Sequence, residues 1–145
     1  ELGQTMQENG IKPEVEIFDA GMVYNSLYYL KNGVLKATIH YQFVLGAAGG
    51  TTATIENLVY LKNLIPADST WSAIGIGKGH MPILMAAIAM GGHIRVGMED
   101  NVLFAKGQLA DSNAQFVTRA GNLIREFGNE VATVQDAREI LGLNK

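Results

Sequence analysis

The chain has 145 residues, 48% of them hydrophobic, and its 11 basic and 14 acidic side chains give a formal net charge of −3. This length and composition suit one folded domain, and the lack of a basic stripe argues against a nucleic-acid partner. No apolar run approaches the roughly 20 residues of a membrane span, which argues against a membrane partner, and the absence of cysteine excludes disulfides and favours a reducing, cytoplasmic compartment.

Strand and helix patterns alternate through the first hundred residues. Residues 1–9 have the pattern of the end of a helix, so we expect the chain to be a piece of a longer one. Charged and apolar residues alternate over 14–18, which predicts a strand, and the β-branched and aromatic residues of 38–45 predict a buried strand. Further strands are expected at 70–76 and within 91–101, and helices at 22–30, 54–64 and 82–90.

The pattern changes after Asn101, where residues 106–112 have the composition of a loop. An amphipathic helix is expected to begin at Ser112 or Asn113 and to stop before Gly128. Thr133 begins a last short helix, since Thr-Val-Gln-Asp is a capping-box pattern.

The repeated strand–helix order predicts a parallel sheet with right-handed crossovers in a single domain over residues 1–145. Four such units make half of a TIM (β/α)8 barrel, and we predict the second half of such a barrel. A four-stranded doubly wound sheet is the alternative fold. Asp19, Gly46, Gly75 and Glu99 all follow expected strands, at the edge where both folds place their functional sites.

The stretch 91–101 ends in two carboxylates and an amide, whereas strands normally end in neutral turn residues. Because side chains alternate along a strand, Arg95 and Glu99 are expected on one face, where they can hold each other and a charged ligand. Two like charges at the rim of a sheet predict a binding or catalytic edge. A structural ion pair between Arg95 and Glu99, with Asp100 capping the next turn, is an alternative of equal weight.

Two glycine-rich segments each follow a strand and open a helix, where backbone N–H groups and the helix dipole favour anions. The candidate binding residues in these segments are Gly46, Gly49, Gly50, Gly75, Gly77 and Lys78. Neither segment matches a Walker loop or the dinucleotide fingerprint. Glycines that serve tight strand-to-helix turns are the alternative explanation.

The three histidines give no metal-binding pattern of their own. His40 and His93 lie early or midway in their strands and are expected to be structural, whereas His80 lies at a helix start beside Lys78 and is the one placed to meet a ligand. A catalytic metal site needs three or four protein or solvent ligands. The chain offers Glu99 as a candidate and no His-x-His pair, so a metal would need ligands from elsewhere.

Two glutamates of the first strand share a face with each other. Glu14 and Glu16 alternate with Val15 and Ile17, so both point into a barrel interior or onto one sheet face. An unpaired carboxylate there is costly, and Arg95 is the expected counter-charge.

Four segments, taken together and in this order, resemble the carboxyl-terminal half of the beta-keto acid cleavage enzymes. They are Phe18-Asp19-Ala20-Gly21-Met22, Gln42-Phe43-Val44-Leu45-Gly46 with Gly49-Gly50, Trp71-Ser72 with Gly75-Ile76-Gly77, and Gly92-His93-Ile94-Arg95-Val96-Gly97-Met98-Glu99-Asp100-Asn101. The tail from Val131 to Leu143 is similar too, so the resemblance covers nearly the whole chain.

The resemblance implies a zinc-dependent TIM barrel that condenses a beta-keto acid with acetyl-CoA and cleaves the adduct to acetoacetate and a new acyl-CoA. It implies that Glu99 is a zinc ligand, with two histidine ligands outside this chain. It also implies that Asp100 is the general base, that Arg95 orients it, and that a glutamate of the first strand joins them. Glu14 is preferred over Glu16 for that role.

At two further positions the chain departs from the pattern of these enzymes. Lys78 stands where relatives often carry arginine, and His80 where they often carry glutamine, which weakens a prediction of coenzyme A contacts there.

We therefore expect an enzyme fragment that is inactive alone, that is completed by a missing amino-terminal half-barrel, and that forms homo-oligomers. A half-barrel exposes two sheet edges, which the missing half or a second copy would cover. Two alternatives remain open from the sequence: a nucleotide- or phosphate-binding doubly wound module, and a non-catalytic TIM-barrel relative.

Overall fold

The computed structural model describes residues 1–143, so the last two residues of the predicted domain 1–145 lie outside the described part. The strands are β1 (Glu14–Ile17), β2 (His40–Leu45), β3 (Thr70–Gly75), β4 (His93–Ile94), β5 (Leu103–Ala105) and β6 (Gln108–Leu109). The helices are α1 (Leu2–Glu8), α2 (Ala20–Lys31), α3 (Ile55–Leu64), α4 (His80–Ala89), α5 (Asn113–Glu126) and α6 (Val134–Leu141). A 3-10 turn, η1 (Gly77–Gly79), precedes α4.

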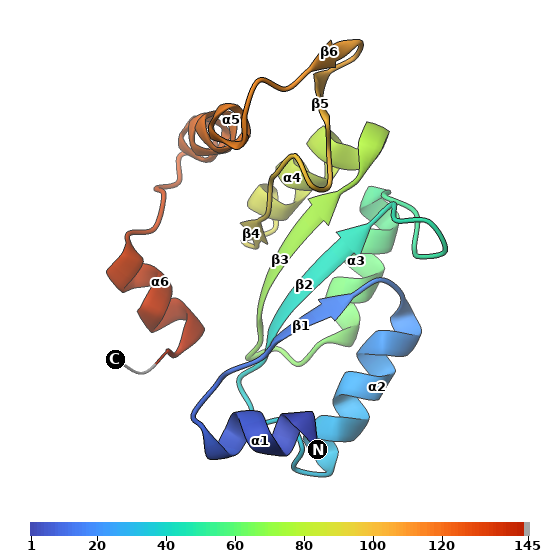
Figure 1. Ribbon diagram of the computed structural model, residues 1–145, viewed down its shortest axis with the longest axis vertical. Helices are drawn as coiled ribbons and strands as arrows, with labels where there is room; N and C mark the ends of the chain where they lie inside the picture. Colours follow the sequence, from blue (N-terminus) through green and yellow to red (C-terminus); the bar gives the residue numbers. More distant parts are fainter. Residues whose placement is uncertain (144–145) are drawn as a thin grey trace.

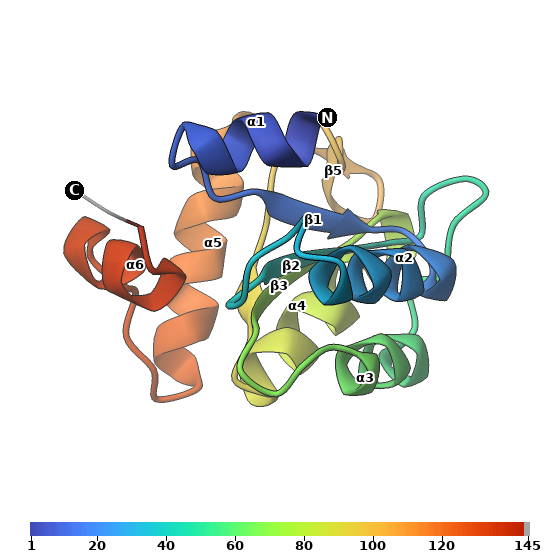
Figure 2. The same ribbon diagram turned by 90° about the horizontal axis from the view of Figure 1, so that it is seen from below.

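The first four strands form one parallel sheet in the order β1-β2-β3-β4 (Figure 1). Helices α2, α3 and α4 make the crossovers and lie together on one side of the sheet (Figure 2). A doubly wound sheet reverses its strand order and carries helices on both faces. The sheet follows the chain order without a reversal, so it has the arrangement of consecutive units in a barrel.

The two faces of the sheet differ in chemistry, because side chains alternate along each strand. One face packs against the helices and forms the core, and its buried members include Ile17, Tyr41, Phe43, Leu45, Trp71 and Ala73 from the strands and Val23, Leu58, Leu61, Ile83 and Ala87 from the helices. The opposite face carries the polar side chains Glu14, Glu16, His40, Gln42, Thr70, Ser72 and His93. A polar second face is typical of the inside of a barrel that holds a site, and a doubly wound sheet would cover both faces with apolar contacts.

Glycine is required where β3 passes into α4. A Cβ atom on Gly75 would lie 2.3 Å from the carbonyl oxygen of Gly79, and one on Gly79 would lie 2.2 Å from the Cβ of Ala53. Both contacts are far shorter than van der Waals distance and one involves backbone. The glycines therefore allow the chain to fold tightly back at the carboxyl end of β3.

The helix starts agree with the predicted caps. The side chain of Thr54 accepts a hydrogen bond from Asn57 N at the start of α3. Ser112 caps α5. Thr133 and Asp136 form the predicted capping box of α6. Each cap satisfies backbone N–H groups that the first helical turn leaves without partners.

The strand expected within 91–101 is present but shorter than the stretch, and the expected loop at 106–112 is wrong in part. β4 contains only two residues, because the backbone leaves the sheet after Arg95 and closes a turn in which Asn101 N donates to Gly97 O (3.0 Å). Part of the expected loop at 106–112 forms the short hairpin of β5 and β6, whose turn uses Gly107 at φ +75°. The sequence reading missed the hairpin because neither strand exceeds three residues.

Among residues 1–143, no helix combines the length and the apolar character that a bilayer crossing requires.

Candidate active site

Arg95 is the centre of an ion-pair network at the carboxyl ends of the strands. Its Nη1 donates to Glu16 Oε1 (2.6 Å). Its Nε and Nη2 donate to the two oxygens of Asp100 (3.2 and 3.4 Å), and Nη2 also reaches Glu99 Oε2 (3.4 Å). One guanidinium therefore fixes three carboxylates, with both oxygens of Asp100 engaged as in a bidentate pair.

The carboxylates differ strongly in how much solvent they meet. The side chain of Asp100 is 9% exposed, that of Glu16 is 46% exposed and that of Glu99 is 84% exposed. Burial alone lowers the pKa of Arg95, but the hydrogen bond that Arg95 donates to Glu16 and the charge of Asp100 outweigh it and raise the pKa above its ordinary value. The network thus holds one cation and three acidic side chains, of which Asp100 is buried and held in one orientation.

The turn from Gly97 to Asn101 places the two acidic residues beside Arg95. Its backbone bond from Asn101 N to Gly97 O closes the turn, and Met98 N donates to Asn113 Oδ1 (2.8 Å) at the start of α5. The predicted strand would have put Asp100 on the face opposite Arg95. The turn instead brings Asp100 to the guanidinium, so the structural difference makes the network more compact than the sequence indicates.

A hollow of about 460 Å³ contains the network and opens at the carboxyl ends of β1 and β2. Its lining residues are Glu16, Phe18, Val44, Gly46, Ala47, Ala48, Ile76, Arg95, Glu99 and Asp100. Charged groups from β1 and from the turn after β4 therefore share one space with the first glycine-rich segment. Both open α/β sheets and barrels place their ligands at this end.

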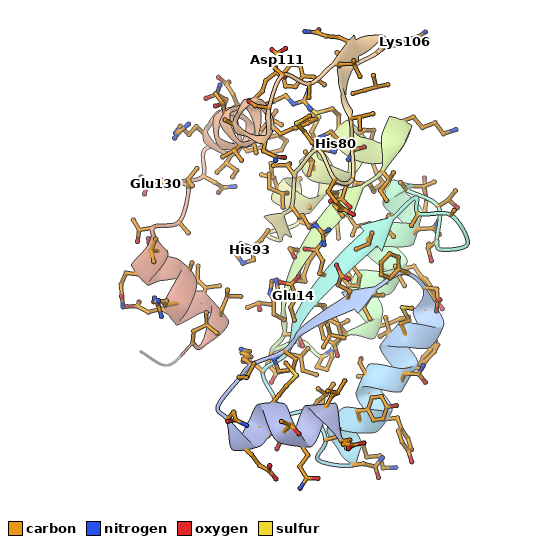
Figure 3. All side chains as sticks on the ribbon, viewed as in Figure 1. Glu14, His80, His93, Lys106, Asp111 and Glu130 are labelled. Carbon is orange, nitrogen blue, oxygen red and sulfur yellow. The ribbon has the colours of Figure 1, made fainter. Side chains whose placement is uncertain are left out.

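Glu16, and not Glu14, is the glutamate of β1 that contacts Arg95. Glu14 lies on the same face, two residues nearer the amino end of β1, and its Oε2 is 3.9 Å from His40 Nε2. Figure 3 shows Glu14 on the same side of the sheet as His93, away from the carboxyl ends. The contact that we predicted for Glu14 is made by Glu16. Both side chains lie on the same face of β1, and Glu16 is two residues nearer the carboxyl end of the strand, where Arg95 lies.

The glycine-rich segments use most of their backbone donors internally. Gly46 N donates to Thr51 O (2.8 Å), Gly50 N to Ala47 O (3.1 Å) and Gly77 N to Asn101 Oδ1 (2.7 Å). These N–H groups therefore already have partners, within the first segment for Gly46 and Gly50 and in the turn after β4 for Gly77.

Other members of the same segments remain open to solvent. Gly49, at φ +81° with nothing near its Cβ position, and the exposed Lys78 lie at the surface. Ligand contacts by the glycine segments stay a prediction, with Gly49 and Lys78 best placed to make them.

Two of the three histidines, His40 and His80, are buried. His40 is 8% exposed and its Nδ1 and Nε2 pair with Thr70 Oγ1 (2.8 Å) and Ser72 Oγ (3.1 Å), as expected for a structural side chain. His80, predicted to face a ligand or solvent, is only 4% exposed. Within residues 1–143, no cluster of three or more potential ligands is arranged to hold a metal ion.

Burial of His40 predicts a loss of stability in acid. Burial, the nearby His93 and Lys12 lower the pKa of His40 from 6.5 to about 4. As the pH falls below 6.5 the unfolded chain takes up this proton and the folded chain does not, so stability decreases until about pH 4. Between pH 7 and 5 this one group accounts for up to about 2 kcal/mol.

A His40→Asn variant of the full-length protein should lose that part of the slope, since asparagine does not titrate. Urea unfolding at pH 7 and 5 measures it for both proteins. Equal pH dependence in the variant and the wild type would contradict the assignment to His40.

The sequence model of the beta-keto acid cleavage enzymes matches residues 1–143. A 3-keto-5-aminohexanoate cleavage enzyme of Fusobacterium nucleatum subsp. nucleatum is 43% identical over 144 residues, covering 99% of this chain and 52% of the relative. A 3-oxoadipate:acetyl-CoA acetyltransferase of Cupriavidus necator is 38% identical over 146 residues, covering 98% of this chain and 51% of the relative. The chain thus spans about half the length of the curated relatives it matches.

Solved structures show the same fold. The apo structure of ObcA matches with a TM-score of 0.83 at 16% sequence identity, covering 99% of this chain and 39% of the ObcA chain. The complex of ObcA with oxaloacetate gives the same TM-score and covers 40% of its chain. Since ObcA is a TIM barrel, the four-stranded sheet is part of a barrel, as the strand order indicates.

Proposed function

Because this chain belongs to the beta-keto acid cleavage enzyme family, we propose that it supplies the acid–base half of an enzyme that acts on a beta-keto acid and acetyl-CoA. The products would be acetoacetate and a new acyl-CoA. The observation that carries the proposal is the network of Arg95 with Glu16, Glu99 and Asp100 inside the hollow at the carboxyl end of the partial barrel.

Asp100 acts as the general base in this proposal. It removes a proton from the carbon between the ketone and the carboxylate of the substrate, and that carbon then attacks the carbonyl carbon of the acetyl thioester and displaces the coenzyme A thiolate. The thiolate adds to the original ketone carbon, and the bond between that carbon and the central carbon breaks. The products are the new acyl-CoA and the acetoacetate carbanion, which takes the proton back from Asp100. Arg95 holds Asp100 by two hydrogen bonds, which fixes the direction of the accepting oxygen. Glu16, on β1, in turn accepts a hydrogen bond from Arg95, which follows β4. Residues from both edges of the sheet therefore hold the base in place.

Glu99 contributes one ligand to a zinc ion in this proposal, and the other protein ligands come from outside the chain. Of the three carboxylates it is the most exposed and has the weakest hold on Arg95, so its oxygens are available. When bound, zinc would polarise the keto oxygen of the substrate. Residues 1–143 alone do not provide a complete ligand set, which agrees with a site shared with another part of the protein.

The coenzyme A part of the thioester would lie against the glycine-rich segments. Lys78 is exposed beside the carboxyl end of β3 and carries the positive charge that a phosphate requires. Gly49 lies at the exposed tip of the first segment, next to residues that line the hollow. The tight turns that support these contacts depend on Gly46, Gly50 and Gly75.

We propose that an amino-terminal half-barrel completes the molecule, and that the full protein forms homo-oligomers. β1 and β4 each have one neighbour in the sheet, so both edges are open within residues 1–143. Helix α6 is amphipathic and buries none of its residues, and Val134 is 77% exposed. Open edges and an uncovered apolar face both favour a further packing partner.

The test is acetoacetate release by the full-length protein. Purified protein with zinc is incubated with a panel of beta-keto acids, with and without acetyl-CoA, and acetoacetate and acyl-CoA are measured together. We expect both products in equal amounts and only when acetyl-CoA is present. A folded, zinc-containing protein that releases neither product from any member of the panel would instead be a non-catalytic relative.

A further inference from the structure

Asn101 is a buried amide whose oxygen and nitrogen both have hydrogen-bond partners. It is 5% exposed, its Oδ1 accepts from Gly77 N (2.7 Å), and its Nδ2 donates to Gly75 O (3.0 Å). The same Nδ2 lies 3.0 Å from His80 Nδ1. A backbone N–H only donates and a carbonyl only accepts, so these partners fix which end of the amide is oxygen and which is nitrogen.

His80 Nδ1 has two polar neighbours, Asn101 Nδ2 at 3.0 Å and Gly75 O at 3.3 Å. An amide NH₂ group cannot accept, so a hydrogen bond with Asn101, the nearer of the two, requires Nδ1 to accept and the ring proton to sit on Nε2. The ring packs edge-on against Phe116, with centroids 5.5 Å apart and planes at 84°. Burial and the charge of Arg119 lower the pKa of His80, which favours this neutral form.

Asn101 therefore joins three parts of the molecule through one side chain. Its backbone closes the turn that carries Glu99 and Asp100, while its amide is bound to the end of β3 and to the glycine turn. His80, its third partner, begins α4.

We infer that Asn101 is a positioning residue for the proposed reaction. Its amide sets the place of the turn carrying Glu99 and Asp100 relative to β3 and the glycine turn, and so aligns the base with the thioester side of the site. This inference rests on the proposed function, because Asp100 is the group being positioned. The inference adds that position 101 requires a side-chain amide, which accepts one hydrogen bond and donates two.

An Asn101→Asp variant of the full-length protein tests that requirement, because aspartate keeps the shape and the acceptor but loses both donors. A displacement of about 1 Å in a catalytic group can cost roughly a hundredfold in rate. We expect kcat to fall about 10- to 100-fold while KM for the keto acid changes less than about threefold, since the substrate contacts remain. Steady-state kinetics with both substrates measure the split.

Asn32→Asp is the matched control, because Asn32 Nδ2 also donates to a carbonyl, that of Tyr28 (2.7 Å), far from the site. It should keep wild-type kcat with a comparable unfolding temperature. A kcat for Asn101→Asp within about threefold of wild type, or an equal loss in Asn32→Asp, would overturn the inference. If Asn101→Asp does not fold, Asn101→Ser is judged by the same criteria.

A second readout does not depend on turnover. In protein labelled with ¹⁵N-histidine, His80 should show an unprotonated Nδ1 and a protonated Nε2 in the wild type, and this pattern should be lost in Asn101→Asp. A protonated Nδ1 in the wild type would contradict the hydrogen bond from Asn101 to His80. If the wild type shows the expected pattern but no activity with any keto acid, the proposed function fails, whereas the structural role of Asn101 in holding the turn still stands.

Discussion

An Asp100→Asn variant of the full-length protein is expected to retain zinc and lose about 10²–10⁴-fold in kcat, the usual contribution of a general base. Asparagine keeps the size of the side chain and one oxygen to accept from Arg95, but its amide cannot take up the proton of the keto acid. The loss corresponds to about 3–5 kcal/mol of transition-state stabilisation. It is measured as acetoacetate released per chain at saturating acetyl-CoA.

Asp111→Asn is the matched control for this change. Asp111 is an exposed acid ahead of α5, and its side chain accepts from Gln115 rather than from any group of the network. Its variant should turn over at the wild-type rate. An Asp100→Asn protein that keeps more than about a tenth of wild-type kcat would remove Asp100 from the role of base.

The fold could be predicted from the sequence where residues close together in the chain determine the local structure. The βα repeat and the caps at Thr54 and Thr133 depend on residues close in the chain, and each is present in the structure. The end of β4 depends instead on the turn at Gly97, where the apolar–polar pattern carries no signal. The barrel was predicted over a doubly wound sheet, and the family resemblance implies it; the strand order and the fold match confirm it.

The site was partly accessible for the same reason. Arg95 and the acidic pair could be found because they lie within five residues of each other. The choice between Glu14 and Glu16 could not be made, since both point to one face and their partner lies 79 residues from Glu16. The role of Asn101 was missed because its amide meets groups 21 to 26 residues earlier, and no local pattern marks it.

The exposure of Glu99 leads to the second large prediction. Glu16 and Asp100 hold Arg95 at 2.6 and 3.2 Å, whereas Glu99 makes one contact of 3.4 Å and is 84% exposed. A metal ligand needs an oxygen lone pair that is not already committed. In the proposed mechanism Glu99 is therefore the zinc ligand, because it is the carboxylate whose loss from Arg95 leaves the contacts of Asp100 and Glu16 in place.

A Glu99→Ala variant of the full-length protein should lose its zinc, from about one ion per chain to near none, and its turnover should fall to background. Metal analysis after dialysis and the acetoacetate assay measure the two effects. Glu126→Ala, which removes an exposed glutamate from the last turn of α5, should change neither. Together with Asp100→Asn, the variants separate two roles: one carboxylate is required for metal and rate, the other for rate alone. Full zinc occupancy in Glu99→Ala would assign the ligand to another residue, even if turnover were lost.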